Sequence, residues 1–190
     1  TSPLYERKVP VKETLTLKSA TFAQGRQMGK TLILPVRWNL ATAKPVLGIN
    51  PAEKLLTNGI RGSLKYSDFE WCSWTNNDSV SFTIDLLKPE VLNTLTLGCI
   101  TNNGMAIHKP ASVKVEVSDD NSNFREAAMQ SFTPEEIFRE GNFIENLPLK
   151  LGGTQGRYVR VSAKGPGVCP ASHVRSGQAS RIFFDEVMLE

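Results

Sequence analysis

The sequence predicts an all-β protein, because hydrophobic and polar residues alternate wherever a pattern exists, and the helical signal is confined to short pieces. The connections between the alternating runs are rich in Gly, Asn, Asp and Ser, which are typical turn residues. The chain has 190 residues, of which 40% are hydrophobic and 22% charged, an ordinary composition for a folded protein. Because domains commonly have about 100–150 residues, this length allows one β-sandwich and a smaller module.

The charge and hydropathy patterns exclude two classes of partner. The formal net charge is +3 and the Lys and Arg residues are scattered, so we expect no nucleic-acid binding. No stretch approaches the ~18 apolar residues of a membrane span, so we expect no insertion into a membrane. The first residues lack the basic-then-apolar pattern of a signal peptide, so the signal of an exported protein would lie upstream.

The first forty-odd residues form a separate unit in the sequence. Two alternating strands, over 15–17 and 32–38, are joined by a predicted turn at 24–29. Because two or three strands are not independently stable, this unit is interpreted as part of a domain or as a flap on the main sandwich. Residues 41–48, which include Pro45, are predicted to be a linker.

Five further strands are predicted from apolar residues at every second position and from a closing apolar run. These strands cover residues 80–86, 95–99, 113–117, 159–163 and 182–189. Turns are expected at 118–123 and at the glycine-rich segment 152–156. A capping box over 133–136, with Pro134 at the first helical position, predicts a short helix from about 134 to 140. The similar segment 50–53 predicts a short helical turn.

The three cysteines show no C-x-x-C spacing that would indicate a zinc or redox motif. Cys99 continues an alternating apolar run, so we expect a buried core thiol. Cys72 and Cys169 lie in loop-like segments and are the only pair considered for a disulfide. Three unbridged thiols are the alternative.

The glycine-punctuated segment 55–63, the pair Glu70-Trp71 and the alternating strand 80–86 follow one another in this order. In this arrangement the chain resembles a discoidin domain, also known as a coagulation factor V/VIII C-type domain. For residues 43–190 the resemblance implies a galactose-binding-like jelly-roll β-sandwich, with Trp71 in its framework. It points to carbohydrate binding and not to catalysis.

The segments 2–5, 14–22 and 25–26 resemble the small immunoglobulin-like C-terminal module of chitobiases and β-hexosaminidases. Residues 1–42 are therefore expected to be part of such a module. The pairing with the sandwich is similar to the C-terminal part of a bacterial chitobiase-type β-N-acetylhexosaminidase. The resemblance implies that a catalytic domain lies N-terminal to this chain, and that the parent enzyme is periplasmic, secreted or displayed on the outer surface.

No catalytic constellation is predicted in this chain. Substrate-assisted hexosaminidases use an adjacent Asp-Glu pair. Here Asp119-Asp120 begins a turn, and Asp185-Glu186 lies in the last strand, where the two side chains are expected to point to opposite faces. Cys169 and His173 are close in sequence, but no neighbouring group is evident that would orient the imidazole or lower the thiol pKa. We therefore expect no enzymatic activity in this chain.

Three loops at one end of the sandwich, 66–77, 101–108 and 165–175, are the predicted sugar-binding region. Sugars are recognised by aromatic faces that stack on C–H patches and by planar polar groups that bind hydroxyls. The candidate residues are Tyr66, Trp74, Asn102, Asn103, His108, His173 and Arg175. Trp74 is the stacking candidate, and His173 matches a Pro-x-x-His position of the family. Ser172 and Met105 stand where relatives tend to carry aromatic residues, which predicts weak binding, a different ligand or a scaffolding role.

The resemblance also implies a structural Ca²⁺, which takes oxygen ligands in domains of this kind. The corresponding positions are Leu55 through its carbonyl, Asn58, Ser63 and Glu186. Asn58 replaces the usual aspartate and removes one negative charge, so we expect a lower affinity. The predicted function is a non-catalytic module that targets a secreted hexosaminidase to glycans with galactose or N-acetylhexosamine ends. A structural or protein-interaction scaffold without sugar affinity is the alternative.

Overall fold

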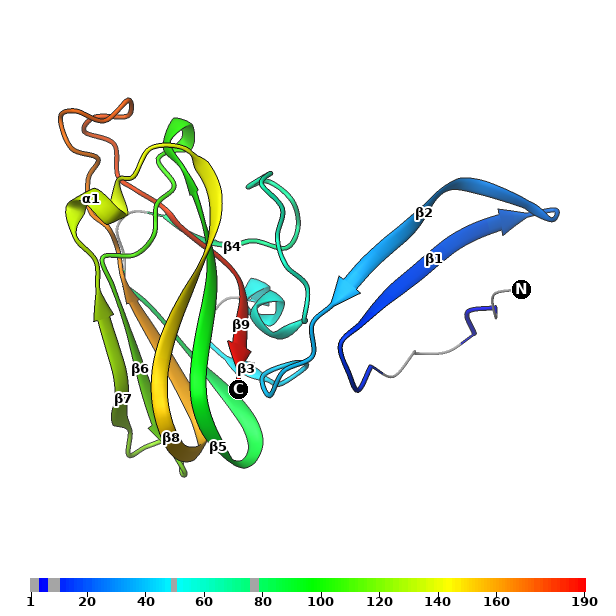
Figure 1. Ribbon diagram of the computed structural model, residues 1–190, viewed down its shortest axis with the longest axis horizontal. Helices are drawn as coiled ribbons and strands as arrows, with labels where there is room; N and C mark the ends of the chain where they lie inside the picture. Colours follow the sequence, from blue (N-terminus) through cyan, green and yellow to red (C-terminus); the bar gives the residue numbers. More distant parts are fainter. Residues whose placement is uncertain (1–3, 7–10, 49–50, 76–78) are drawn as a thin grey trace.

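The computed structural model describes residues 4–6, 11–48, 51–75 and 79–190, and it consists almost entirely of antiparallel β-strands (Figure 1). The predicted all-β class is therefore confirmed. The strands are β1 (Leu15–Ala23), β2 (Arg26–Val36), β3 (Val46–Leu47), β4 (Cys72–Trp74), β5 (Val80–Asn102), β6 (Ser112–Ser118), β7 (Arg125–Ser131), β8 (Asn142–Lys164) and β9 (Ile182–Leu189). The short helical pieces are η1 (Pro51–Thr57), η2 (Asn103–Met105) and α1 (Pro134–Ile137).

Two long strands, β5 and β8, form the centre of the jelly-roll β-sandwich. The strand order is β4-β9-β5-β8-β6-β7, and β3 pairs with β5 at one edge. Figure 1 shows β5 and β8 side by side along the whole length of the sandwich, with β6 and β7 on one side and β9 on the other. β5 contains two of the predicted strands, 80–86 and 95–99, and β8 contains one, 159–163, so the sequence pattern underestimated the length of both long strands.

The predicted alternation is confirmed along the buried faces. The apolar positions of the predicted runs are almost fully buried, and they are Val80, Phe82, Ile84, Leu86, Leu95, Leu97, Cys99, Val113, Val115, Val117, Val159, Val161 and Ala163. They form one continuous core together with the closing strand β9. The core thiol predicted at Cys99 is among them, and burial raises its pKa well above the ordinary value of a thiol.

The turn predicted at 152–156 is wrong, because this segment lies inside β8. The register moves from Leu92–Thr154 to Thr94–Lys150, so residues 151–153 oppose Asn93 alone. Gly152 and Gly153 have φ of 64° and 78°, values that glycine adopts without strain. The glycines therefore form a bulge that bends β8 without ending it.

An ion pair between Asp85 and Arg157 connects β5 to β8. Arg157 Nε and Nη2 donate to the two carboxylate oxygens of Asp85 at 2.8 Å each, and Asp85 Oδ1 also accepts from the Leu87 N–H at 2.8 Å. Leu87 has a positive φ of 70°. The hydrogen bond from Arg157 is the main reason why the pKa of Asp85 is lowered.

We expect Asp85→Asn to lower the free energy of unfolding by about 1–2 kcal/mol at neutral pH. A carboxyl group whose folded-state pKa is lowered contributes stability above its ordinary pKa, here 3.8, and loses it as the pH falls through the folded-state pKa. The difference between wild type and variant should therefore narrow at acidic pH in urea unfolding followed by circular dichroism. Asp119→Asn, which removes an exposed pair with Arg125, is the control and should have little effect. If the variant were less stable than the wild type by the same free energy at every pH, this explanation would be contradicted.

The N-terminal hairpin β1–β2 forms its own two-stranded sheet, which extends away from the sandwich (Figure 1). Its turn is tighter than predicted, because only Gln24 and Gly25 connect the strands, with φ of 49° and 75°. Positive φ at both central residues is the geometry that matches the twist of a hairpin. Parts of the N-terminal motif, including Ser2 and Pro3, lie outside the described residues. The division of the chain after residue 42 stays a prediction.

The segment predicted to be a linker, 41–48, instead packs onto the sandwich. Ala41 is fully buried in the core, and β3 pairs Val46 with Ile84 of β5. The Leu40 N–H donates to the carbonyl of Leu189 in the last strand. The segment therefore covers an edge of the sheet and does not act as a spacer.

The predicted capping box is confirmed, but its helix is short. The hydroxyl of Thr133 accepts from the Glu136 N–H, and the Glu136 carboxylate accepts from the Thr133 N–H. The helix α1 ends at Ile137, three residues before the predicted end. Residues 138–141 leave the helix and run across one end of the sandwich. The predicted helical turn near 50–53 corresponds to η1, although Asn50 lies outside the described residues.

Candidate functional site

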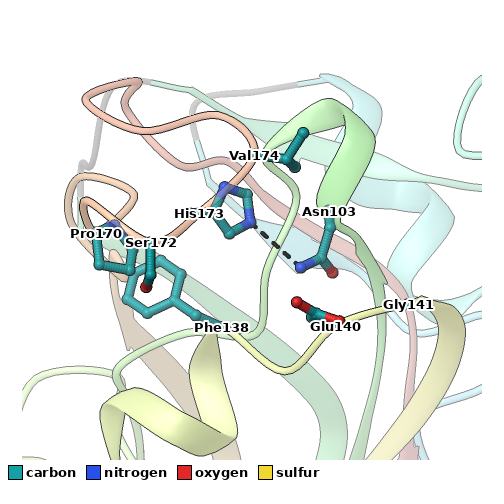
Figure 2. Close-up of a pocket in the computed structure, with 8 residues that line it drawn as sticks. All are labelled: Asn103, Phe138, Glu140, Gly141, Pro170, Ser172, His173 and Val174. Atoms are coloured by element: carbon teal, nitrogen blue, oxygen red, sulfur yellow. Dashed lines mark hydrogen bonds between the residues drawn. The ribbon is translucent and has the colours of Figure 1, made fainter.

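One end of the sandwich carries a hollow of about 360 Å³ (Figure 2). Three connections surround it: the turn after β5, the segment after α1 and the loop that precedes β9. Its lining residues are Asn103, Phe138, Glu140, Gly141, Pro170, Ser172, His173 and Val174. Two of these connections belong to the predicted sugar-binding loops, and the segment after α1 does not.

The turn after β5 positions Asn103. Asn102 and Ile107 exchange two backbone hydrogen bonds, so the chain turns back directly after the strand. Ala106 has a φ of 53° and closes this turn. The side chain of Asn103 enters the hollow (Figure 2), whereas that of Asn102 is not among the lining groups.

His173 is fixed by its own loop and faces Asn103. Its N–H donates to the carbonyl of Pro170 at 2.9 Å, and its Nδ1 accepts from the Arg175 N–H at 2.9 Å. Its Nε2 lies 3.3 Å from the side-chain nitrogen of Asn103, as Figure 2 shows. Because Nδ1 accepts, a neutral imidazole carries its proton on Nε2, so the group of the planar Asn103 amide that pairs with Nε2 is its oxygen. The amide nitrogen then remains to donate to a ligand hydroxyl or a water molecule.

Arg175 positions the loops around the hollow. Its Nε donates to the carbonyl of Gly104 at 2.7 Å, which links the loop before β9 to the turn after β5. Arg175 is exposed and does not line the hollow, so its visible role is to hold His173 and Asn103 together.

His108 lies behind the hollow and is fully buried. Its ring contacts those of Phe138 and His173 at centroid distances of 5.0 Å and 4.9 Å. Burial, with a smaller contribution from His173, lowers its pKa to about 4, so the imidazole is neutral at neutral pH. The structure therefore brings His108 next to His173 but not to the surface of the hollow.

Phe138 is a site residue that the sequence prediction missed. It is half-buried, and its ring lines the hollow next to the His173 ring, with the two centroids 6.1 Å apart (Figure 2). Glu140, two residues further on, is exposed and brings a carboxylate to the same hollow. The capping box at Thr133 and Glu136 starts the helix α1, which ends at Ile137 directly before this segment. It is the nearest sequence signal to both residues.

Tyr66 and Trp74 are not among the residues that line this hollow. Tyr66 packs edge-on against Phe183 at 6.2 Å. Trp74 is half-buried in β4, stacked on Phe82 at 6.4 Å and tilted against Phe184 at 5.5 Å. Both rings therefore pack against neighbouring aromatic rings. Residues 76–77 at the end of this predicted loop lie outside the described residues.

The prediction that Trp71 packs in the framework is confirmed, since it is 7% exposed. Its Nε1 donates to the carbonyl of Ser63 at 3.0 Å. A Cβ atom on Gly62 would lie 2.3 Å from the indole ring, so glycine is needed for this close approach.

The expectation that Asp185 and Glu186 point to opposite faces is wrong. The β9 register moves from Cys99–Phe184 to Leu97–Val187, so both acidic residues oppose Gly98 in a bulge. Asp185 Oδ2 accepts from the Gly62 N–H and Glu186 Oε2 from the Gly59 N–H, at 3.0 Å each. Both carboxylates therefore hold the same loop.

The turn predicted at Asp119-Asp120 is confirmed. Asp120 Oδ1 accepts from the backbone N–H groups of Ser122 and Asn123, at 2.9 Å and 2.8 Å. These bonds lower the pKa of Asp120. This carboxylate therefore stabilises the turn, as the sequence indicates.

The predicted calcium ligands are only partly brought together. The Asn58 N–H donates to the carbonyl of Leu55, and Glu186 is bonded to the neighbouring residue Gly59. Ser63 lies further along the loop, where its backbone and hydroxyl bond to other loop residues. The structure adds Glu70, whose carboxylate accepts from the Asn58 amide at 2.8 Å.

Glu186 is the residue of this group that fits a cation best. It is fully buried, and its Oε1 makes no hydrogen bond of normal geometry, although the side chain of Asn39 lies close enough to act on the carboxylate. Burial is the main cause that raises its pKa to about 9, and Arg61 opposes this effect. Because Arg61 is paired with Asp185, Glu186 has no ion pair of its own among the described residues, and a hard cation would supply one.

The disulfide considered between Cys72 and Cys169 is not formed in the described structure, where all three cysteines are buried. Cys169 Sγ instead lies 3.5 Å from Ser180 Oγ and 3.9 Å from His108 Nε2. No helix in the described part of the chain is long and apolar enough to cross a membrane.

A jelly-roll sandwich with a polar, aromatic-walled hollow at its loop end defines a class of binding domains. Within that class the chain belongs to the F5/8 type C domain family, which its residues 45–176 match. No curated protein matches the sequence.

Solved structures share the fold at low sequence identity. Chitosan-binding module 1 of a chitosanase/glucanase from Paenibacillus sp. IK-5 is 15% identical, with a TM-score of 0.53, and the alignment covers 81% of this chain and 99% of that chain. Module CpGH89CBM32-6 of Clostridium perfringens is 17% identical, with a TM-score of 0.51 and coverage of 80% and 98%. A fucose binding module of Streptococcus pneumoniae is 18% identical, with a TM-score of 0.50 and coverage of 89% and 98%.

Proposed function

We propose that this chain is a carbohydrate-binding module that binds the exposed ends of glycans in the hollow between Asn103, Phe138 and His173. The convergence of one aromatic ring with an amide, an imidazole and a carboxylate in a single hollow carries this proposal. Pyranose rings have an apolar C–H face and an edge of hydroxyl groups. The hollow offers a counterpart to each.

The apolar part of a sugar is assigned to Phe138, which provides the aromatic surface that Ser172 and Met105 do not. Aromatic contacts contribute about 0.5–1.5 kcal/mol beyond the area they bury. The hydroxyl groups are assigned to Asn103, His173 and Glu140. Planar groups that donate or accept two hydrogen bonds suit neighbouring hydroxyls.

Galactose and N-acetylhexosamine ends are the proposed ligands. Among the proteins with the same fold, one is a fucose binding module and another a chitosan-binding module, which supports a carbohydrate as the class of ligand. The hollow is small and open, which suits one or two terminal residues better than a long chain. Weak affinity is expected, because Phe138 is the one aromatic residue among the lining groups.

The proposed parent is a secreted or periplasmic glycoside hydrolase of the chitobiase type. The N-terminal segments that resemble the chitobiase C-terminal module support this proposal. A tethered module needs only weak affinity, because linkage to the enzyme raises the effective ligand concentration into the millimolar range. The role proposed here is therefore to hold the enzyme near its glycan.

A structural Ca²⁺ is proposed at Leu55, Asn58 and Glu186, with Ser63 as a further predicted ligand. The buried Glu186 carboxylate supports it. Bound Ca²⁺ would supply a positive charge that fixes the loop 55–63 against β9.

We expect millimolar Ca²⁺ to raise the melting temperature of the wild-type chain and a chelator to reverse the shift. A hundredfold excess over Kd corresponds to about 2.7 kcal/mol of added stability. Glu186→Gln should abolish the shift, whereas Glu90→Gln, which removes a carboxylate outside the proposed site, should retain it. An equal shift in Glu186→Gln would place the cation elsewhere.

A glycan array, run with Ca²⁺ and again with chelator, tests the proposed function. Binding to galactose or N-acetylhexosamine ends is the expected result. Absence of binding to any glycan at high protein concentration would overturn it and favour the scaffold alternative. Loss of binding with chelator would connect the loop 55–63 to the hollow.

A further inference from the structure

One thiol and two imidazoles form a cluster beneath the hollow. The ligand atoms of His108, Cys169 and His173 all lie within 4.8 Å of one another. His108 follows the turn after β5, whereas Cys169 and His173 belong to the loop before β9. The cluster therefore joins two segments that are far apart in the sequence.

We propose that this cluster binds Zn²⁺, with Cys169, His108 and His173 as its three protein ligands. Thiolate sulfur and imidazole nitrogen are the donors that zinc prefers, whereas Ca²⁺ takes oxygen ligands. The site is therefore chemically distinct from the oxygen donors near Asn58 and Glu186. It goes beyond the proposed sugar binding and does not depend on it.

The orientation of His108 suits a metal ligand. His108 is fully buried, and its Nε2 lies 3.9 Å from Cys169 Sγ. The backbone of Ile137 lies close enough to the ring to raise the pKa of His108. An imidazole that binds a metal through one nitrogen commonly donates its other N–H to a backbone carbonyl or a carboxylate.

The hollow gives an ion access to the cluster. His173 lines the hollow, whereas Cys169 is only 3% exposed and His108 is fully buried. Three protein ligands leave the fourth position of a tetrahedral Zn²⁺ for water or another small ligand. Asn103 lies beside His173 and offers a hydrogen-bonding group to such a ligand.

Binding requires one local change at His173. Its Nδ1 accepts from the Arg175 N–H, and its Nε2 faces the Asn103 amide. A metal ion takes one of the two nitrogens, so one of these contacts must break. Residues 174–179 are exposed, so this loop can adjust without disturbing the core.

The expected consequence is a cross-link of the loop that carries His173. Between β8 and β9 the backbone makes only turns and isolated bridges, such as Val168–Ala179. A metal ion would connect this loop to His108, which is anchored by its N–H bond to the carbonyl of Arg181. Zn²⁺ should therefore raise the melting temperature of the folded chain.

Titration of the tag-free chain with Co²⁺, in buffer that contains Ca²⁺, tests the proposal. The expected spectrum has a thiolate-to-cobalt charge-transfer band and the intense visible bands of a four-coordinate ion, and Zn²⁺ should remove both. Cys169→Ser should lose the charge-transfer band, and His173→Asn should weaken Co²⁺ binding by more than about tenfold. Cys99→Ala is the matched control, because it removes a buried thiol outside the cluster and should keep the band.

Circular dichroism of each variant separates loss of the site from loss of the fold. A folded wild-type chain without a charge-transfer band would overturn the proposal, and so would a band that persists in Cys169→Ser. Sugar binding is probed through Asn103 and Phe138, so either proposal can fail while the other stands.

Discussion

Arg61→Met is expected to destabilise the sandwich by about 3–5 kcal/mol, because it leaves a buried carboxylate without its cation. Arg61 Nε donates to Asp185 Oδ2 at 2.7 Å, and the side chain of Asp185 is fully buried. Gly98 faces this pair so closely that an added Cβ atom would lie 1.9 Å from Asp185 Oδ1. There is therefore little space for water to replace the guanidinium group.

Urea unfolding followed by circular dichroism measures this effect. Lys88→Met is the control, since it removes an exposed pair with Glu90 and should cost at most about 1 kcal/mol. Adding Asp185→Asn to the Arg61→Met variant should recover part of the stability, because it removes the uncompensated charge. If Arg61→Met and Lys88→Met lowered the free energy of unfolding equally, the ion pair between Arg61 and Asp185 would not stabilise the sandwich as we describe.

Asn103→Ala and Phe138→Ala are each expected to weaken sugar binding by about tenfold or more, which corresponds to about 1.4 kcal/mol. Asn103→Ala removes an amide that bonds to hydroxyls and also releases His173 from its contact at 3.3 Å. Phe138→Ala removes the apolar wall of the hollow. Isothermal titration calorimetry with the best glycan from the array provides the measurement.

Phe124→Ala is the matched control for Phe138→Ala. Phe124 is also half-buried, and its ring stacks on Arg160 at 3.5 Å, away from the lining residues of the hollow. Its replacement should leave the affinity unchanged. Equal losses in Phe124→Ala and Phe138→Ala would mean that general destabilisation, and not contact with the sugar, causes the effect.

The strands could be predicted from the sequence because burial of one face imposes a period of two that is visible in a single chain. The alternation from Val80 to Leu86 is an example, whereas the closing strand Ile182–Leu189 is buried at almost every position and was predicted from its apolar run. The full length of β8 could not be predicted, because Gly152 and Gly153 are typical turn residues but form a bulge within this strand. The same limit applies to Asp185 and Glu186, whose bulge depends on pairing with a distant strand.

The candidate site could be predicted only in part. Asn103 and His173 lie in loops that the family resemblance pointed to, and the structure brings them to within 3.3 Å. Phe138 follows a helix that is distant in sequence, and only the folded chain places its ring beside that of His173. Trp74 was predicted to be a sugar-stacking residue in a loop. In the structure it lies in β4, and its ring packs against Phe82.

The proposed sugar site is tested most directly by a titration of the ¹⁵N-labelled chain with galactose and with N-acetylglucosamine, followed by amide chemical shifts. We expect shifts confined to Asn103, residues 138–141 and residues 172–174, with little change at Tyr66 and Trp74. Shifts centred on Tyr66 and Trp74 would contradict the assignment of the hollow. No shifts at high millimolar sugar would contradict the proposed function itself.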